Sequence, residues 1–178
     1  MDRGAGATFG TAKAWPAARV AEFLRLAVQE RAVRTVLVGD AAGADLVAAI
    51  GREATDLPWR QALPGPAAVI DLTGRTTLPQ LAALLRASEA FLGNDSGVMH
   101  VAAALGVPTL GLFGSSSVPW TAPRGPRARA LAAAGFACQP CFRRTCNQPR
   151  FCLDTISGAA ALAALDAVIA APTAGVRP

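Results

Sequence analysis

The chain has 178 residues, of which 52% are hydrophobic and only 16% are charged, and its formal net charge is +5. This composition excludes an intrinsically disordered protein, because disorder requires low hydrophobicity and a high net charge. A chain of this length is expected to form one domain and to bury a sizeable core without disulfides.

The positive charge is concentrated in one segment. Residues 96–153 contain none of the 12 Asp and Glu residues but six of the 17 Lys and Arg residues, so the rest of the chain is close to neutral. A basic segment of this kind indicates an anionic partner, although a basic surface kept for solubility would have the same composition.

The long uncharged stretch between Ser96 and Pro123 does not predict a membrane span. Pro108 and several glycines and serines interrupt it before ~18 apolar residues accumulate. The N-terminus has no apolar run typical of a signal peptide. We therefore expect a cytoplasmic protein whose cysteines are reduced or bind metal.

Short apolar runs alternate with amphipathic stretches along the chain, as in a parallel sheet covered by helices on both faces. The fold class predicted is α/β, a Rossmann-like parallel sheet with flanking helices. The expected helices are 16–28, 42–52, 78–85, 98–105 and about 156–171, and the expected strands are 35–38, 68–72, 90–93, 108–113 and 128–133.

Capping residues and breakers support several of these boundaries. Thr77 is expected to be the N-cap of one helix, and Gly106, two residues before Pro108, the C-cap of another. Residues 57–66 are rich in Pro and Gly and predict a loop.

The motif Gly93-Asn94-Asp95-Ser96-Gly97 connects a predicted strand to a predicted helix. Ligands gather at the carboxyl ends of parallel strands, where the first N–H groups of the next helix are free to bind a phosphate. Asp95 fits two roles here. It is either the N-cap of the helix, or it faces sugar hydroxyls, since a carboxylate beside a diphosphate is unfavourable.

Two further features lie close to helix starts. His100, the only histidine, follows Ser96 by about one helical turn, so its ring can lean back toward a phosphate, although a lone histidine is more often a packed or surface residue. Lys13, the only lysine, lies in a Gly- and Thr-rich loop over residues 6–16 that is not a Walker A motif.

Together these motifs resemble a known family. The run from Asn94 to Pro108, followed by Leu112-Phe113-Gly114, resembles the donor-binding motif of family 9 glycosyltransferases, the bacterial lipopolysaccharide heptosyltransferases. The opening loop, residues 6–16, resembles the start of that family's C-terminal domain, and the cysteine cluster is similar to one in many heptosyltransferase II-like members. The resemblance extends over residues 5–170.

The resemblance implies a fold and an activity. Members have the two-domain GT-B fold, so residues 1–178 would be a single nucleotide-sugar-binding domain, the C-terminal half, with the N-terminal acceptor domain and the general base absent. The implied function is to bind ADP-heptose for an inverting transfer of heptose to the lipopolysaccharide inner core. This isolated chain would be inactive, and no cofactor would be required.

The resemblance also implies partners and site residues. The acceptor would be the lipid A-core, and peripheral contact with the inner face of the inner membrane is expected, without nucleic acid. Lys13 would stabilise charge on the departing ADP, as a divalent metal does in other transferases. The implied donor-binding residues are Thr8, Lys13, Asp45, Asp95, Ser96, Gly97 and His100.

Four cysteines, Cys138, Cys141, Cys146 and Cys152, are crowded into the loop 138–152 with the spacing C-x2-C-x4-C-x5-C. They supply enough thiolates for a tetrahedral zinc ion, so a structural zinc site is one hypothesis. With no second CxxC pair, a cluster of reduced thiols and a set of disulfides remain alternatives.

Two other functions remain open. A GT-B sugar-nucleotide epimerase domain would share the architecture without requiring the cysteine loop. A non-catalytic module, binding a nucleotide or, through its basic segment, nucleic acid, is the other alternative. Nucleic acid is disfavoured because only Phe142 and Phe151 accompany the arginines as stacking platforms.

Overall fold

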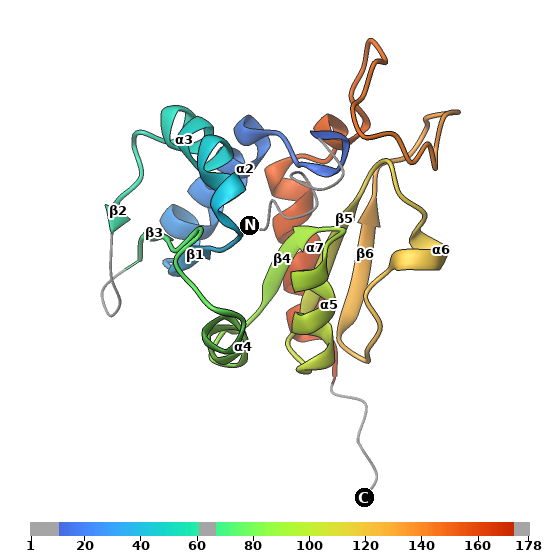
Figure 1. The fold of residues 1–178 in the computed structure, drawn as a ribbon. Helices are drawn as coiled ribbons and strands as arrows, with labels where there is room; N and C mark the ends of the chain where they lie inside the picture. The colour runs from blue at the N-terminus through green and yellow to red at the C-terminus, as the bar shows by residue number, and fades with distance from the viewer. Residues whose placement is uncertain (1–10, 61–66, 173–178) are drawn as a thin grey trace, which may run out of the picture.

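The computed structural model describes residues 11–60 and 67–172, and it shows an α/β arrangement of two three-stranded parallel sheets with flanking helices (Figure 1). The strands are β1 (Thr35–Leu37), β2 (Trp59–Arg60), β3 (Val69–Asp71), β4 (Phe91–Asn94), β5 (Thr109–Phe113) and β6 (Ala128–Ala132). The helices are α2 (Ala17–Arg25), α3 (Ala44–Glu53), α4 (Leu78–Arg86), α5 (Gly97–Ala104), α6 (Val118–Thr121) and α7 (Gly158–Ala170).

The first sheet has the order β1-β3-β2 and the second the order β4-β5-β6. The predicted class, a parallel α/β fold, is confirmed, whereas the strands form two sheets in place of the one expected. In the second sheet β5 is central and buried along its whole length. Its Leu110 and Leu112 belong to the cluster that contains α7, while Phe113 packs with Met99 of α5. The alternation of side chains along β5 therefore places α5 and α7 on opposite faces of this sheet (Figure 1).

One hydrophobic core joins the two sheets. It includes Leu37 and Val69 of the first sheet, Leu112 of the second, and Val20 and Leu24 of α2. Helix α2 packs against both α3 and α7, so it lies between the two halves of the chain. The helical spacing of apolar residues after Pro16 is confirmed, although the last turns, Leu26–Glu30, continue as a π-helix.

The predicted N-cap is confirmed, whereas Leu105 and not Gly106 is the C-cap residue of α5. Thr77 precedes α4 in a full capping box, in which its side chain accepts from the Gln80 N–H and the Gln80 side chain accepts from the Thr77 N–H. Gly106 follows α5 with φ +77°, a conformation that glycine adopts without steric cost.

Three elements differ from the predictions. β2 lies in the stretch expected to be a loop, and α6 was not predicted. The last helix begins at Gly158 instead of residue 156, because the Ser157 hydroxyl accepts from the Ala160 N–H and caps it there. Among residues 11–60 and 67–172, no helix is long and apolar enough to span a membrane.

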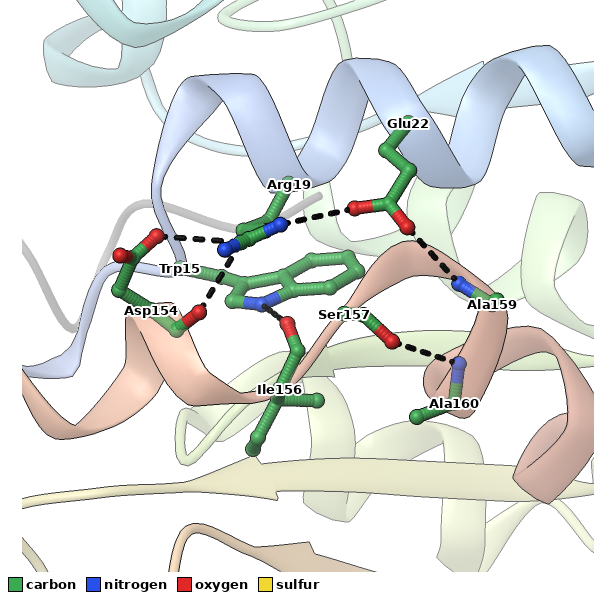
Figure 2. A network of polar contacts seen from close by, with 8 residues as sticks. All are labelled: Trp15, Arg19, Glu22, Asp154, Ile156, Ser157, Ala159 and Ala160. Carbon is green, nitrogen blue, oxygen red and sulfur yellow. Dashed lines mark hydrogen bonds and ion pairs between the residues drawn. The ribbon is translucent and has the colours of Figure 1, made fainter.

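A polar network fastens the start of α2 to the start of α7 (Figure 2). The Arg19 guanidinium donates to the Asp154 carboxylate at 3.1 Å and to Glu22 at 3.2 Å, and Glu22 in turn accepts from the Ala159 N–H. Partial burial opposes ionisation of Glu22, but the backbone N–H groups of Gly158 and Ala159 and the Arg19 guanidinium outweigh it and lower the pKa of the carboxyl. An ionised Glu22 therefore lies at the positive end of α7.

This contact between helices depends on Gly158. A methyl group at its Cα would overlap the backbone nitrogen of Phe23 and lie 2.8 Å from the carbonyl carbon of Glu22, and neither backbone atom can rotate away. We predict that Gly158→Ala lowers the free energy of unfolding by about 2 kcal/mol in urea denaturation. The control is Gly51→Ala within α3, whose added methyl would touch only Trp59 at 4.0 Å. That variant should be neutral or more stable. Equal stability of Gly158→Ala and the native chain would contradict the packing described.

Candidate active site at the carboxyl ends of β4 and β5

The motif 93–97 occupies the position that the sequence predicts. Gly93 and Asn94 end β4, Asp95 and Ser96 form the connection, and α5 begins at Gly97. Asn94, Asp95 and Ser96 are all buried, with exposed fractions of 1%, 5% and 8%. Buried polar side chains need partners, so the contacts of these residues show how the site is organised.

Asp95 forms an ion pair with Lys13. The Lys13 Nζ lies 2.7 Å from the Asp95 Oδ2, and the two residues are 82 positions apart in the sequence. The same oxygen accepts a hydrogen bond from the Thr121 hydroxyl of α6 at 3.2 Å. Three separate segments therefore meet at one carboxylate. The alternative role for Asp95, an N-cap, is wrong, because Ser96 is the N-cap residue of α5.

The segment that carries Lys13 is held by Trp15 and Asn94. The backbone N–H of Trp15 donates to the Asn94 Oδ1 at 3.2 Å. The Trp15 indole N–H donates to the Ile156 carbonyl at 2.9 Å, as Figure 2 shows. The Trp15 side chain is fully buried. A rigid anchor two residues from Lys13 fixes the path of the chain that brings the ammonium group to the end of β4.

Unpartnered hydroxyl groups gather at the ends of β4 and β5. Within the described part of the chain, the buried hydroxyls of Ser96, Ser115 and Ser116 have no hydrogen-bond partner. Ser96 at the N-cap position also makes no side-chain bond to the first turn of α5, although serine at this position usually does. Buried hydroxyls without partners cost stability, and a ligand rich in oxygen atoms would satisfy them.

The two other residues predicted near the start of α5, Gly97 and His100, are exposed. Gly97 is exposed, and a methyl group at its Cα would meet nothing within 4 Å. His100 is exposed on the second turn of α5. The start of α5, with its N–H groups directed outward, is therefore open to a ligand.

Asp45 lies in the first turn of α3 and borders a different part of the site. It lines a pocket of ≈ 460 Å³ together with Thr11, Ala14 and Trp15, next to the Lys13 segment. The size is within the range of small-molecule pockets, about 300–1,000 Å³. The structure thus brings Asp45 to the same segment as Lys13, whereas Thr8 lies outside the described residues.

The four cysteines, Cys138, Cys141, Cys146 and Cys152, are free thiols that line a single pocket. Burial raises the pKa of the Cys152 thiol, and the three neighbouring thiols add to the shift. In residues 11–60 and 67–172, no group of three or more His, Cys, Asp or Glu side chains is arranged to hold a metal ion, so the geometry adds no support to the zinc hypothesis.

The zinc hypothesis is tested by metal content. If Cys138, Cys141, Cys146 and Cys152 hold zinc, the purified protein should contain close to one metal per chain by elemental analysis, and Co²⁺ should give the visible absorption of a tetrahedral thiolate site. Cys141→Ser should abolish both signals. A folded, metal-free protein with four reactive thiols would contradict zinc and favour the reduced cluster.

Comparison with known proteins decides the family. Residues 5–151 match the profile of glycosyltransferase family 9 (heptosyltransferase). The chain belongs to glycosyltransferase family 9. It is 38% identical over 130 residues to lipopolysaccharide heptosyltransferase 2 of Escherichia coli, a match that covers 71% of this chain and 34% of that protein. It is 28% identical over 141 residues to lipooligosaccharide heptosyltransferase 2 of Campylobacter jejuni, covering 79% of this chain and 41% of the relative.

Solved structures agree with this assignment. The structure of the E. coli ADP-heptose lipopolysaccharide heptosyltransferase II has a TM-score of 0.66 and 30% identity, covering 90% of this chain and 43% of that one. A family 9 glycosyltransferase from Veillonella parvula has a TM-score of 0.67 at 23% identity, covering 89% of this chain and 42% of that one, a likeness of fold. The chain spans about a third of the length of the E. coli lipopolysaccharide heptosyltransferase 2.

Within this family 9 chain, the sequence did not indicate the roles of several residues of the site. Asn94 and Thr121 hold the Lys13 segment and Asp95, and the hydroxyls of Ser115 and Ser116 lie at the end of β5. The run of three serines directly after a predicted strand was a usable signal, because strand ends collect ligands in such folds. Thr121 lies on the unpredicted α6 and had no such signal.

Proposed function

We propose that this family 9 chain binds ADP-heptose and supplies the donor-binding part of an inverting glycosyltransferase that transfers heptose to the lipopolysaccharide inner core. The relatives named as lipopolysaccharide heptosyltransferases support the reaction class, and the name of the E. coli structure includes ADP-heptose. The observation that carries the proposal is the site at the ends of β4 and β5. It combines one cation, an uncapped helix start and three buried hydroxyls without partners.

These features match the charges of a nucleoside diphosphate sugar. The start of α5 at Gly97 offers N–H groups to phosphate oxygens, and Lys13 adds a full positive charge beside them. Asp95 neutralises Lys13 in the free protein, so the pair must open or share its contacts when the diphosphate arrives. In the complex we place Asp95 on sugar hydroxyls and Asp45 on the ribose, the remaining polar groups of the donor.

In the transfer, an acceptor hydroxyl attacks the anomeric carbon of heptose as the bond to ADP breaks. Negative charge then develops on the departing phosphate, and Lys13 together with the start of α5 would stabilise it. The acceptor proton must pass to a base, and no described residue is assigned that role. The part played by this chain is to bind, orient and stabilise the leaving group.

Calorimetry with ADP and UDP tests the proposal. We expect the 178-residue chain to bind ADP and to bind UDP more weakly, because the donor proposed for it is an ADP-sugar. A folded chain that binds neither nucleotide would contradict the proposal. Preference for UDP would favour a sugar-nucleotide epimerase domain.

A substitution at Gly97 separates ligand contact from folding. Since a methyl group there meets nothing within 4 Å, Gly97→Ala should leave the stability unchanged or slightly raised. In the complex the methyl would occupy the space of a phosphate, so we predict that the affinity for ADP falls about tenfold, or ~1.4 kcal/mol. The control is Gly51→Ala, which lies in α3 away from the motif and should bind ADP normally. Unchanged ADP affinity in Gly97→Ala would place the diphosphate elsewhere.

A further inference from the structure

Two large aromatic side chains are exposed side by side on the surface. Trp120 is 74% exposed and Phe142 is 53% exposed, and their rings stack with centroids 5.7 Å apart and planes inclined by 23°. Trp120 belongs to α6, which lies beside the edge strand β6, and Phe142 belongs to the cysteine loop (Figure 1). Soluble proteins seldom expose adjoining large apolar groups without a binding role.

The structure fixes Phe142 in this exposed position. Its φ is +51°, a left-handed conformation that is unfavourable for a bulky residue and persists only where neighbouring contacts impose it. The Phe142 N–H donates to the Ser115 carbonyl at 2.8 Å, and the Gln139 side chain donates to the Gly114 carbonyl at 2.8 Å. The same segment, Gly114–Ser117, leads into α6, so the loop and the helix are held to each other at the stack.

The charges on these two segments have one sign. Arg124 follows Trp120 by four residues, and Arg143 follows Phe142 directly; both are exposed. No acidic residue occurs between Ser96 and Leu153, the stretch of the sequence that contains both. A surface that combines exposed tryptophan with exposed arginine is complementary to a negatively charged membrane, where the indole ring lies among the lipid headgroups and the guanidinium groups contact phosphates.

We infer that the Trp120–Phe142 stack and the arginines beside it form a docking surface for anionic phospholipid membranes. The geometry favours this partner over single-stranded nucleic acid, which binds to successive platforms along a groove, whereas here the two rings cover each other. A membrane requires only that the outer edges of the rings be accessible. Docking of this surface to a membrane does not depend on ADP binding, so either of the two proposals can fail without the other.

Tryptophan fluorescence with lipid vesicles tests the inference. Trp15 is fully buried and Trp59 partly buried, so a change in emission on adding vesicles reports mainly on Trp120. With vesicles of phosphatidylcholine containing about one-third phosphatidylglycerol, we expect a blue shift and cosedimentation, both weakened by salt. Pure phosphatidylcholine vesicles should bind at least tenfold more weakly.

Substitutions at the proposed surface test which residues contact the membrane. Trp120→Ala and Phe142→Ala should each lower partitioning into anionic vesicles at least tenfold in cosedimentation, and Arg124→Gln combined with Arg143→Gln should remove most of its salt dependence. The matched control is Leu78→Ala, because Leu78 is 78% exposed but lies at the start of α4, outside the acid-free segment. Circular dichroism of each variant confirms that it folds.

Several outcomes would overturn the inference. They are no binding of the folded chain to anionic vesicles, binding that Trp120→Ala and Phe142→Ala leave intact, or an equal loss in Leu78→Ala. Binding of short single-stranded RNA that depends on Trp120, without vesicle binding, would also overturn it and assign the surface to nucleic acid.

Discussion

Replacing Lys13 by alanine should weaken ADP binding by about 2–2.7 kcal/mol, or roughly thirty- to a hundredfold. The ammonium group lies at the end of β4, and a cation in this place gains charge-assisted hydrogen bonds to the diphosphate. The loss is enlarged by Asp95, because its buried carboxylate would then face the phosphates without a neutralising partner. Calorimetry with ADP at fixed ionic strength measures the effect.

The same substitution should also destabilise the fold, since it removes the cation from a carboxylate that is only 5% exposed. A second variant distinguishes the two effects. Lys13→Ala combined with Asp95→Asn removes the uncompensated charge, so the free energy of unfolding should recover while ADP affinity recovers only in part. Arg31→Ala is the control for loss of an ion pair, because Arg31 and Asp166 are 55% and 41% exposed. Native ADP affinity in the double variant would contradict a role for Lys13 in binding.

The elements with strong local signals could be predicted from the sequence. The strands around Val36, Ile70, Leu92, Leu110 and Ala130 were found because apolar runs are bounded by Gly, Pro or polar residues. β2 was missed because it is two residues long and lies in a Pro- and Gly-rich stretch, and α6 because it has a single turn with Pro119 near its start. Pairing is not encoded in periodicity, so the division into two sheets could not be foreseen.

The site shows the same division between local and long-range information. The motif 93–97 could be placed at a strand end because the strand, the glycines and the next helix are all local. The ion pair of Lys13 with Asp95 joins residues 82 positions apart, and no local pattern predicts such a contact. The stack of Trp120 on Phe142 depends on the path of two loops, which no periodic pattern describes.

The anchor of the Lys13 segment should be among the most costly residues to replace. Trp15 is fully buried, contacts Phe23 edge to face at 6.2 Å and donates its indole N–H to the Ile156 carbonyl. We predict that Trp15→Ala lowers the free energy of unfolding by about 3–5 kcal/mol, because it leaves a large cavity and a carbonyl without its donor. Urea denaturation followed by circular dichroism measures the change. Trp120→Ala is the matched control, since its side chain is 74% exposed, and it should change stability by less than about 0.5 kcal/mol.

A milder substitution, Trp15→Phe, tests whether the indole hydrogen bond positions Lys13 in the site. Trp15→Phe keeps most of the apolar contact and removes only the indole N–H, so we expect a loss of about 1–3 kcal/mol. The backbone N–H of Trp15 still reaches the Asn94 side chain, and Lys13 should therefore remain near Asp95 and bind ADP within a few-fold of the native affinity. Loss of ADP binding in a stable Trp15→Phe protein would mean that the indole hydrogen bond, and not the contact with Asn94, positions Lys13. Retained binding would assign that positioning to the backbone of the segment itself.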